Sequence, residues 1–299
     1  MKKSIFILSL LLILLNCKTA DKKGGDLQNK INQITSDKKA LIGVSILNLD
    51  GREVASINGQ EKLPMQSVYK FHIALAVLSE VDRGRFSLDQ KVDIKKSDWY
   101  PNTWSPMRDD NPEGGSFTVA QLLEYAVSKS DNIACDELLK LLGSPKNVDA
   151  YIKSQGIKNV SIKLTEKEMQ ATWDAMYENW TTPHAASEIA YKFYTDKKLL
   201  SQKSHDFLWK IMHETNTGEN RLKGNLPNGT IVAHKTGTSG RKDGVLAACN
   251  DMGIVMLPNG NYFVITVFVT QSKENDAENE KIIAEISKAA YDYFLANKL

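Results

Sequence analysis

The chain has 299 residues, with 38 Lys and Arg against 36 Asp and Glu and a formal net charge of +2. Because this balance is nearly neutral, it argues against a nucleic-acid-binding protein. The length leaves about 270 residues after the N-terminal segment, which is enough for one large core or two interlocked cores.

The first residues have the pattern of a signal sequence. Met1-Lys2-Lys3 is basic, residues 5–15 form an apolar run, and polarity returns at Asn16. The apolar run is too short to span a membrane, so residues 1–17 are predicted to be a signal sequence that directs export to the periplasm. Residues 18–26 are polar and are predicted to form a tether. Loss of the first 16 residues removes Lys2 and Lys3 and brings the formal charge to zero.

Cys17 is a candidate lipidation site. It follows Leu14-Leu15-Asn16, which is similar to a bacterial lipoprotein box with Asn in the place of the usual small residue. A lipid on Cys17 would tether the mature chain to a membrane. Plain secretion is the alternative, although cleavage after Ala20 would put Lys18 where a small residue is expected.

The remaining chain predicts sheet, then helices, then sheet. Alternation and β-branched residues favour strands first and last, while apolar spacing of three and four favours helices between them. The expected strands are 41–49, 54–57, 230–234, 247–257 and 262–270, and the expected helices are 68–83, 119–128, 132–142, 183–194, 204–214 and 277–297.

The short links between these strands predict antiparallel hairpins and an α/β fold of the α+β type. Asp50-Gly51 joins the first two strands and Pro258-Asn259-Gly260 joins the last two, which is too short for a crossover helix. Residues 27–63 with 215–299 would form an antiparallel sheet flanked by N- and C-terminal helices, and residues 64–214 an inserted helical domain.

Cysteines and histidines give no sign of a metal site or another cofactor. The five histidines form no ligand spacing with one another or with cysteine. Beyond Cys17, only Cys135 and Cys249 remain, on an apolar helical face and in a strand-like run. Two separately buried thiols are the favoured interpretation, and a disulfide between them is the alternative.

Ser67-Val68-Tyr69-Lys70 places a serine at the start of an amphipathic helix and a lysine one turn later. Free N–H groups and the positive end of the helix dipole favour an oxyanion near Ser67. Lys70 shares its face, so it could receive the Ser67 proton if its own pKa is depressed. An ordinary N-cap is the alternative for Ser67.

Ser130-Asp131-Asn132 links two predicted helices and can present side chains to a cleft. The Ser130 hydroxyl could carry a proton to a departing nitrogen, and the Asn132 amide could hold both Lys70 and a substrate amide. Asp131 is expected to hold the loop in place rather than to contact the substrate. The alternative is an N-cap of the following helix, and both roles can hold together.

Lys235-Thr236-Gly237-Thr238 is expected directly after a strand. Lys235 would add positive potential, while the hydroxyls of Thr236 and Thr238 would bind a carboxylate. Gly237 would let a ligand approach the backbone. The N–H of Thr238, with that of Ser67, would form an oxyanion hole.

These three strings in this order resemble the penicillin-recognising serine enzymes, and the chain resembles the class A β-lactamases. The resemblance runs from about residue 40 to the C-terminus and is strongest to the PER/VEB-type extended-spectrum branch. It implies a serine β-lactamase and penicillin-binding-protein-like fold, a monomer without a cofactor, and small-molecule β-lactam substrates. Branch membership implies hydrolysis of cephalosporins as well as penicillins.

The stretch Leu164 to Gln170 resembles the class A omega loop, which implies that Glu166 activates the deacylating water and that Gln170 helps hold it. The family usually ends this element in Leu-Asn, where this chain has Met169-Gln170, and usually carries Arg in the place of Leu164. The missing Arg removes a bracing salt bridge and predicts a differently folded loop.

Two further site residues rest on the likeness to this branch. Arg221 would support recognition of the substrate carboxylate, with a solvated surface charge as the alternative. Trp104 would flank the cleft entrance, with a core or interdomain position as the alternative.

The sequence therefore predicts a hydrolase of cyclic amides that forms an acyl-enzyme on Ser67. One rival is a DD-peptidase that acts on cell-wall peptides, against which Glu166 argues. The other is a non-catalytic sensor that is acylated once. Release or retention of bound penicillin separates the first of these rivals from the predicted hydrolase.

Overall fold

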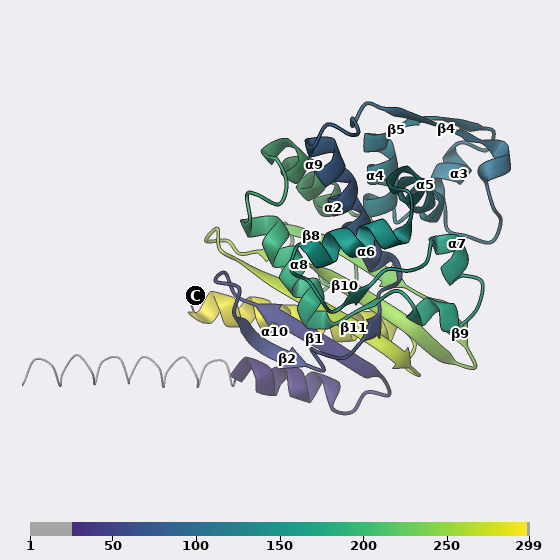
Figure 1. Cartoon of the computed structure of the whole chain (residues 1–299). Coiled ribbons are helices and arrows are strands. Elements are labelled where there is room, and N and C mark those ends of the chain that lie inside the picture. Colours follow the sequence, from purple (N-terminus) through teal and green to yellow (C-terminus); the bar gives the residue numbers. More distant parts are fainter. Residues whose placement is uncertain (1–25, 298–299) are drawn as a thin grey trace, which may run out of the picture.

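The computed structural model describes residues 26–297, which form two stacked layers, a sheet with helices on both faces and a group of helices above it (Figure 1). The predicted signal sequence with Cys17, and nearly all of the predicted tether, lie outside the described residues. Within residues 26–297, no helix is long and apolar enough to cross a membrane.

The main sheet is antiparallel and confirms the predicted hairpins. Its order is β2-β1-β11-β10-β8, with the short β9 also paired to β10. Gly51 and Gly260, with φ of 75° and 84°, lie in the turns of the two hairpins, and glycine adopts this backbone without strain. The strands are β1 (Leu41–Leu47), β2 (Glu53–Ile57), β8 (Val232–Thr238), β9 (Arg241–Lys242), β10 (Val245–Met256) and β11 (Tyr262–Ser272).

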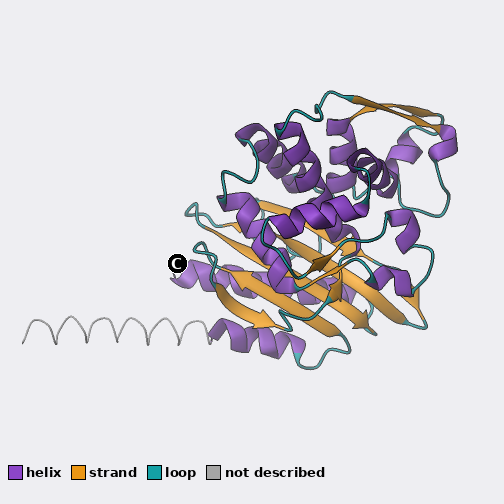
Figure 2. Cartoon of the chain, in the orientation of Figure 1, coloured by secondary structure: helices purple, strands orange, loops and turns teal. Residues whose placement is uncertain are grey.

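Alternating side chains of the sheet supply two separate cores. On β11, Phe263 and Ile265 share a core with α10 (Asp276–Asn297), which lies under the sheet, whereas Val264 and Phe268 belong to the core of the helical layer. This alternation follows from the two-residue period of a strand. A helix over residues 26–35 lies on the same face as α10, and α8 (Pro183–Thr195) packs against the other face (Figure 2).

The helical layer is built around α2 (Tyr69–Asp82), whose residues 69–79 are all buried. Because it is buried on every side, this helix is apolar nearly all round, with Lys70, His72 and Ser79 as its buried polar residues. It is preceded by the short 3-10 helix η1 (Gln66–Val68). The surrounding helices are α4 (Val119–Ser128), α5 (Asn132–Leu142), α6 (Pro145–Ser154) and α9 (Gln202–His213).

Smaller elements connect the layers and frame the cleft. They are α3 (Pro106–Asp110), α7 (Glu166–Met169), η2 (Lys96–Asp98), η3 (Asp174–Tyr177), a hairpin of β4 (Lys91–Lys95) and β5 (Gly114–Thr118), and a small sheet of β3 (Leu63–Pro64), β7 (Trp180–Thr181) and β6 (Val160–Ser161). None of these elements, nor α6, was among the elements expected from periodicity.

One predicted position was wrong. The segment from Lys235 to Thr238 was expected after a strand, but β8 continues through Thr238, which pairs with Cys249 of β10. Backbone pairing with a long neighbouring strand therefore overrides the weak strand preference of Gly237. Cys135 and Cys249 are free, buried thiols, as the favoured interpretation of the sequence had it.

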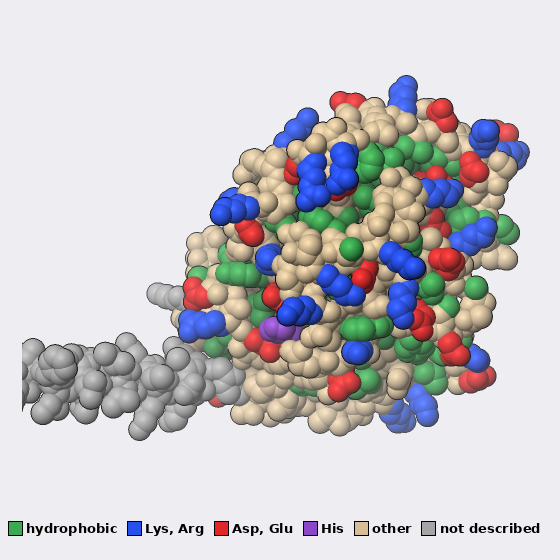
Figure 3. All heavy atoms as spheres, viewed as in Figure 1, with side chains coloured by type: hydrophobic (Ala, Val, Ile, Leu, Met, Phe, Trp, Pro, Cys, Tyr) green, Lys and Arg blue, Asp and Glu red, His purple; other side chains and the backbone are tan. Residues whose placement is uncertain are grey.

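Charged side chains of both signs are interspersed on the face shown in Figure 3. This distribution agrees with the nearly neutral composition.

The division into two domains at residues 63/64 and 214/215 stays a prediction, because α8, from the predicted helical part, packs directly against β1 and β11 of the sheet.

Candidate active site

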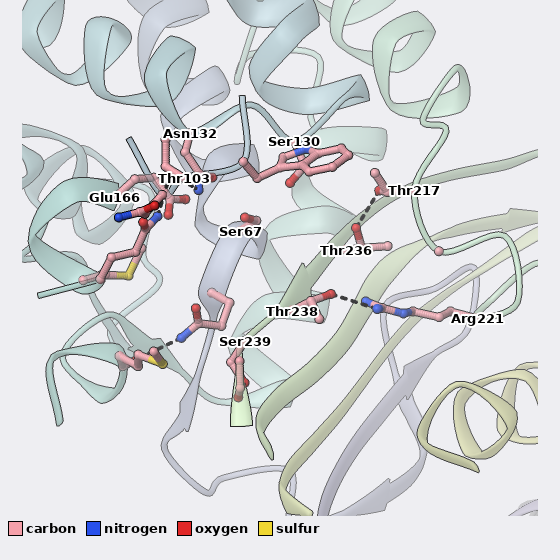
Figure 4. A pocket seen from close by; sticks show the side chains of 18 residues that line it. Ser67, Thr103, Ser130, Asn132, Glu166, Thr217, Arg221, Thr236, Thr238 and Ser239 are labelled. Carbon is pink, nitrogen blue, oxygen red and sulfur yellow. Dashed lines mark hydrogen bonds between the residues drawn. The ribbon is translucent and has the colours of Figure 1, made fainter. Parts of the chain in front are cut away.

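A cavity of about 340 Å³ opens between the helical layer and the edge strand β8. It collects side chains from every string that the sequence singled out (Figure 4). Its lining includes Ser67, Asn102, Thr103, Trp104, Ser130, Asn132, Glu166, Met169, Gln170, Thr217, Arg221, Thr236 and Thr238.

Ser67 lies in η1, directly before α2, on a constrained piece of backbone. The preceding residue, Gln66, has a positive φ of 47°, a conformation that costs a non-glycine residue free energy. The Gln66 side chain donates to the Met176 carbonyl at 3.2 Å and fixes this turn. Ser67 is not the N-cap of α2, so the N-cap alternative for this serine is wrong.

Lys70 is buried and surrounded by oxygen atoms. Its Nζ lies 2.9 Å from Ser67 Oγ, 2.8 Å from the Ser130 carbonyl, 2.5 Å from Asn132 Oδ1 and 3.0 Å from Glu166 Oε1. An ammonium group has only three N–H donors for these four neighbours. Three of the contacts are hydrogen bonds donated by Nζ, to Ser67 Oγ, the Ser130 carbonyl and Asn132 Oδ1. The fourth is an ion pair with Glu166, whose Oε1 accepts no hydrogen bond among the described residues.

The Ser130 loop is held in place from three sides. Ser130 itself has φ of 58°, and its Oγ accepts a hydrogen bond from Lys235 Nζ at 2.9 Å. Asp131 caps α5 through the Ala134 N–H at 2.9 Å and also accepts from Ser105 Oγ. Asp131 therefore pins the loop, as expected, and is fully buried beneath it.

Strand β8 forms the opposite wall of the cavity. A Cβ on Gly237 would lie 2.4 Å from the Met65 carbonyl oxygen, so only glycine lets the strand run this close to η1. Thr236 Oγ1 lies 2.6 Å from Thr217 Oγ1. Lys235 is fully buried, and burial, together with repulsion from Lys70, holds its pKa well below the usual range.

Arg221 is a buried side chain rather than a surface charge, so the alternative for this residue is wrong. Its guanidinium donates to the Gly237 carbonyl at 3.2 Å, to the Asn250 carbonyl at 3.0 Å and to Thr238 Oγ1 at 2.8 Å. Arg221 therefore contacts the end of β8 at the cavity wall, and the dashed line in Figure 4 marks its bond to Thr238.

Trp104 lies at the cavity entrance with 61% of its surface exposed, so the core alternative for this residue is wrong. Its indole Nε1 donates to the Lys129 carbonyl at 2.9 Å, next to Ser130. This bond fixes the ring over the loop that leads into Ser130-Asp131-Asn132.

The two neighbouring carboxylates of the omega loop point to different places. Glu166 is buried and reaches Lys70, whereas Glu168 is exposed and accepts from Thr165 N at 2.9 Å in a capping box. Because Glu168 has a structural role at the start of α7, Glu166 is the carboxylate available to the cavity.

Asp136 on α5 anchors the start of α7. Its two oxygens accept from the N–H of Glu166 at 2.7 Å and of Lys167 at 3.1 Å, and one also accepts from Tyr100 Oη. Burial raises the pKa of Asp136 to about 6, and the nearby Glu166 carboxylate adds to this shift. The two backbone hydrogen bonds act against this rise in pKa, and they hold the backbone of Glu166, the residue that faces Lys70.

Asn179 braces the same loop in a chain that lacks the usual Arg at position 164. It accepts from the N–H of Lys163 at 2.8 Å and of Leu164 at 3.0 Å, and donates to the Leu164 carbonyl at 2.8 Å. Its amide also contacts Met169 Sδ at 3.2 Å. A buried amide thus supports the loop by hydrogen bonds to its backbone.

Thr103 links the omega loop to the Ser130 loop. Its Oγ1 accepts from Gln170 Nε2 and from Asn132 Nδ2, each at 2.9 Å (Figure 4). Both amides that the sequence assigned to water or substrate are therefore joined through one hydroxyl. Thr103 belongs to none of the strings that predicted the site, and its position beside Trp104 is the only signal in the sequence that points to it.

Among the described residues, no group of three or more His, Cys, Asp or Glu side chains is arranged to hold a metal ion. The cavity presents instead hydroxyl, amide, ammonium and carboxylate groups.

Known proteins share both the sequence and the fold. The model of the β-lactamase enzyme family matches residues 26–294. β-Lactamase VEB-1 of Pseudomonas aeruginosa is 49% identical over 267 residues, covering 89% of each chain, and extended-spectrum β-lactamase PER-1 of the same organism is 46% identical over 270 residues, covering 90% of this chain and 87% of that one.

A crystal structure described as a representative of class A β-lactamase from Bacteroides cellulosilyticus DSM 14838 superposes with a TM-score of 0.88 at 40% identity, covering 92% of this chain and 99% of that chain. These matches confirm the resemblance and the fold class expected from the three strings. The chain belongs to the β-lactamase enzyme family and is a class A serine β-lactamase.

Proposed function

We propose that the chain opens the β-lactam amide of penicillins and cephalosporins through an acyl-enzyme on Ser67, which water activated by Glu166 then hydrolyses. The observation that carries this proposal is the position of Lys70 Nζ, 2.9 Å from Ser67 Oγ and 3.0 Å from Glu166 Oε1. A single amine joins the nucleophile of the first half-reaction to the base of the second.

In the acylation step, Ser67 Oγ attacks the β-lactam carbonyl. Its proton passes either to Lys70 or through Lys70 to Glu166. The carbonyl oxygen takes up negative charge, for which the N–H groups of Ser67 and Thr238 are the candidate donors. The C–N bond then breaks, and the ring nitrogen needs a proton. Ser130 is suited to deliver it, because its hydroxyl contacts Lys235 and its carbonyl contacts Lys70.

In the deacylation step, Glu166 takes a proton from water as the water attacks the ester carbon, and Ser67 is released with a proton returned to its oxygen. Glu166 is suited to this role because only 4% of its surface is exposed and Asp136 fixes its backbone. Gln170 is the candidate to orient that water.

Substrate binding is assigned to the wall formed by β8. The carboxylate that penicillins and cephalosporins carry would meet the hydroxyls of Thr236 and Thr238, with positive charge from Lys235 and Arg221. The contact between Arg221 and Thr238 at 2.8 Å supports a shared role for them. Asn132 would hold the substrate amide, and Trp104 would border the entrance.

Steady-state hydrolysis of a chromogenic cephalosporin by the purified mature protein tests this proposal. We expect repeated turnover, with many product molecules released per enzyme. A single stoichiometric burst, followed by stable acylation of Ser67, would instead identify a penicillin-binding DD-peptidase or a sensor.

We also propose that the chain is exported to the periplasm and tethered there by a lipid on Cys17. The basic start, the apolar run over residues 5–15 and the lipoprotein-like sequence before Cys17 support this. The wild-type protein should partition into the detergent phase, and Cys17→Ser should block its maturation. A soluble mature chain that begins beyond Cys17 would contradict the tether.

A further inference from the structure

A buried histidine and a buried aspartate lie together under β8, outside the reaction steps described above. His234 belongs to β8 and Asp251 to β10, and both are fully buried. The imidazole Nδ1 lies 2.9 Å from each of the two Asp251 carboxylate oxygens. Such a close contact between a ring nitrogen and a carboxylate requires a proton on Nδ1.

The second ring nitrogen indicates the charge of the pair. His234 Nε2 is buried and has no hydrogen-bond partner among the described residues. A proton on Nε2 would leave a buried donor unsatisfied, which is costly, so the geometry favours a neutral imidazole with its proton on Nδ1. The pair therefore carries one net negative charge, located on Asp251.

The contacts of Asp251 connect it to two cations of the proposed carboxylate site. One contact is His234, which precedes Lys235 in the chain. The other is the backbone N–H of Leu222, which donates to Asp251 Oδ2 at 3.3 Å and directly follows Arg221. Asp251 thus bonds to the chain neighbours of both Lys235 and Arg221.

The charges around Lys235 show why a buried carboxylate matters there. Lys70 from α2 and Arg221 disfavour its ammonium form, whereas Glu166 from α7 and Asp251 from β10 favour it. On its other side, Asp251 also favours the charged form of the half-buried Lys223. Without Asp251, the four neighbouring cations Lys70, Lys235, Arg221 and Lys223 would be opposed by Glu166, by Glu219 near Lys223 and, next to Arg221, by Glu280 at 3.3 Å.

We propose that Asp251, oriented by His234, is a positioning residue for substrate-carboxylate recognition, because it fixes the segments that carry Lys235 and Arg221 and places a buried negative charge beside these two cations. This inference rests on the proposed function of these two cations. Asp251 itself lies behind the strand and does not line the cavity.

Asp251→Asn tests the proposal through kinetics on a carboxylate-bearing cephalosporin. We expect kcat/KM to fall by about 10- to 100-fold, mostly through KM, as for loss of a charge-assisted contact. We also expect the alkaline limb of the kcat/KM profile to move to lower pH, because removal of a negative charge lets Lys235 lose its proton more easily.

Ser187→Ala is the matched control, since it also removes buried hydrogen bonds at the sheet, to Thr266 Oγ1 at 2.8 Å and to the Ser45 carbonyl at 3.1 Å, but touches neither cation. It should keep the wild-type alkaline limb. An Asp251→Asn enzyme that loses thermal stability but retains both the wild-type KM and the wild-type alkaline limb would overturn the proposal.

Two variants of His234 provide a second test if Asp251→Asn does not fold. His234→Asn can keep an N–H donor toward Asp251 and should retain KM within about threefold, whereas His234→Leu should raise KM as Asp251→Asn does. Equal KM values in these two variants would overturn the orienting role of His234. In the wild-type protein, ¹⁵N NMR should show His234 protonated on Nδ1 alone at neutral pH, and the other tautomer would equally overturn it.

Covalent labelling of Ser67 by penicillin separates failure of this inference from failure of the proposed function. If wild-type enzyme is labelled at Ser67 and turns over substrate, the proposed function holds whatever the Asp251 variant does.

Discussion

Two parts of the cleft, the surroundings of Lys70 and the omega loop, differ in which residues hold their side chains in place. Around Lys70, the contacts are made by the strings themselves, since Ser67, Ser130 and Asn132 all touch its Nζ. The omega loop is different, because Glu166 reaches Lys70 only through support from residues outside that loop's own sequence motif. The comparison shows that one half of the proposed reaction is locally encoded and the other depends on remote hydrogen bonds.

The support of the omega loop consists of hydrogen bonds with one carboxylate, one amide and one hydroxyl. Asp136 holds the N–H groups of Glu166 and Lys167, Asn179 holds the backbone around Leu164, and Thr103 holds Gln170. We therefore expect substitutions near Lys70 to stop acylation, and substitutions at the omega loop to affect mainly deacylation.

Ser67→Ala is expected to have the largest effect, because it removes the nucleophile. Turnover should fall by roughly 10⁴- to 10⁶-fold and covalent labelling by penicillin should disappear. The melting temperature should remain close to wild type, because the Ser67 hydroxyl is partly exposed. Labelling at another serine would contradict the assignment.

Glu166→Gln should separate the two halves of the reaction. The neutral amide cannot take a proton from water, so deacylation should slow by about 10²- to 10⁴-fold while acylation through Lys70 continues. Intact-protein mass spectrometry should then show a stable adduct.

Glu168→Gln is the matched control, because Glu168 is exposed and, among the described residues, its side chain bonds only within the capping box around Thr165. It should turn over substrate nearly as the wild type does. A trapped adduct in Glu168→Gln instead would mean that the two carboxylates were assigned the wrong way round.

Local signals explain why some elements were predicted to the residue. Helix α4 begins at a capping box between Thr118 and Gln121, and α5 begins at the Asp131 cap and ends at Gly143, which has φ of 93°. These caps act within one turn of the chain, so the sequence shows them directly. The expected ranges 119–128 and 132–142 match the structure.

Other features depend on contacts that no local pattern reveals. The two strands of the β4–β5 hairpin are separated by α3, so no short turn marks them. Strand β8 extends through Gly237 because β10 pairs with it that far. Thr103 and Asn179 act on residues 10 to 67 positions away, which sequence spacing alone cannot connect.

Acidification should change the contributions of the two regions to the free energy of unfolding in opposite directions. His72, fully buried on α2, has its pKa lowered by burial to about 4 from 6.5, so below pH 6.5 the unfolded chain binds the proton first. Its contribution to the free energy of unfolding should therefore fall by up to about 3 kcal/mol between pH 6.5 and 4. His72→Leu should reduce this loss in chemical denaturation measured across that range.

Asp136 has the opposite sign, because its pKa is raised to about 6 from 3.8 and the folded state binds the proton first. Its contribution to stability rises as the pH falls from about 6 to 3.8. Asp136→Asn should therefore make the acid loss of stability steeper than in the wild type. Equal slopes for wild type, His72→Leu and Asp136→Asn would contradict both assignments.

The smallest effect is expected at Thr103, which joins the two regions. Thr103→Val keeps the shape of the side chain but removes the oxygen that accepts from Asn132 and Gln170. Thr103 is half-buried, so water can replace part of the lost bonding, and kcat/KM should fall by no more than about 10-fold. Acylation of Ser67 should change less than deacylation, because Asn132 stays fixed through its Oδ1 contact with Lys70, whereas Gln170 has only Thr103 as its side-chain partner among the described residues. Thr103→Ser keeps the acceptor and should behave as the wild type. Wild-type kinetics in Thr103→Val together with a loss in Thr103→Ser would show that the Thr103 methyl group, rather than its hydroxyl, supports the loop.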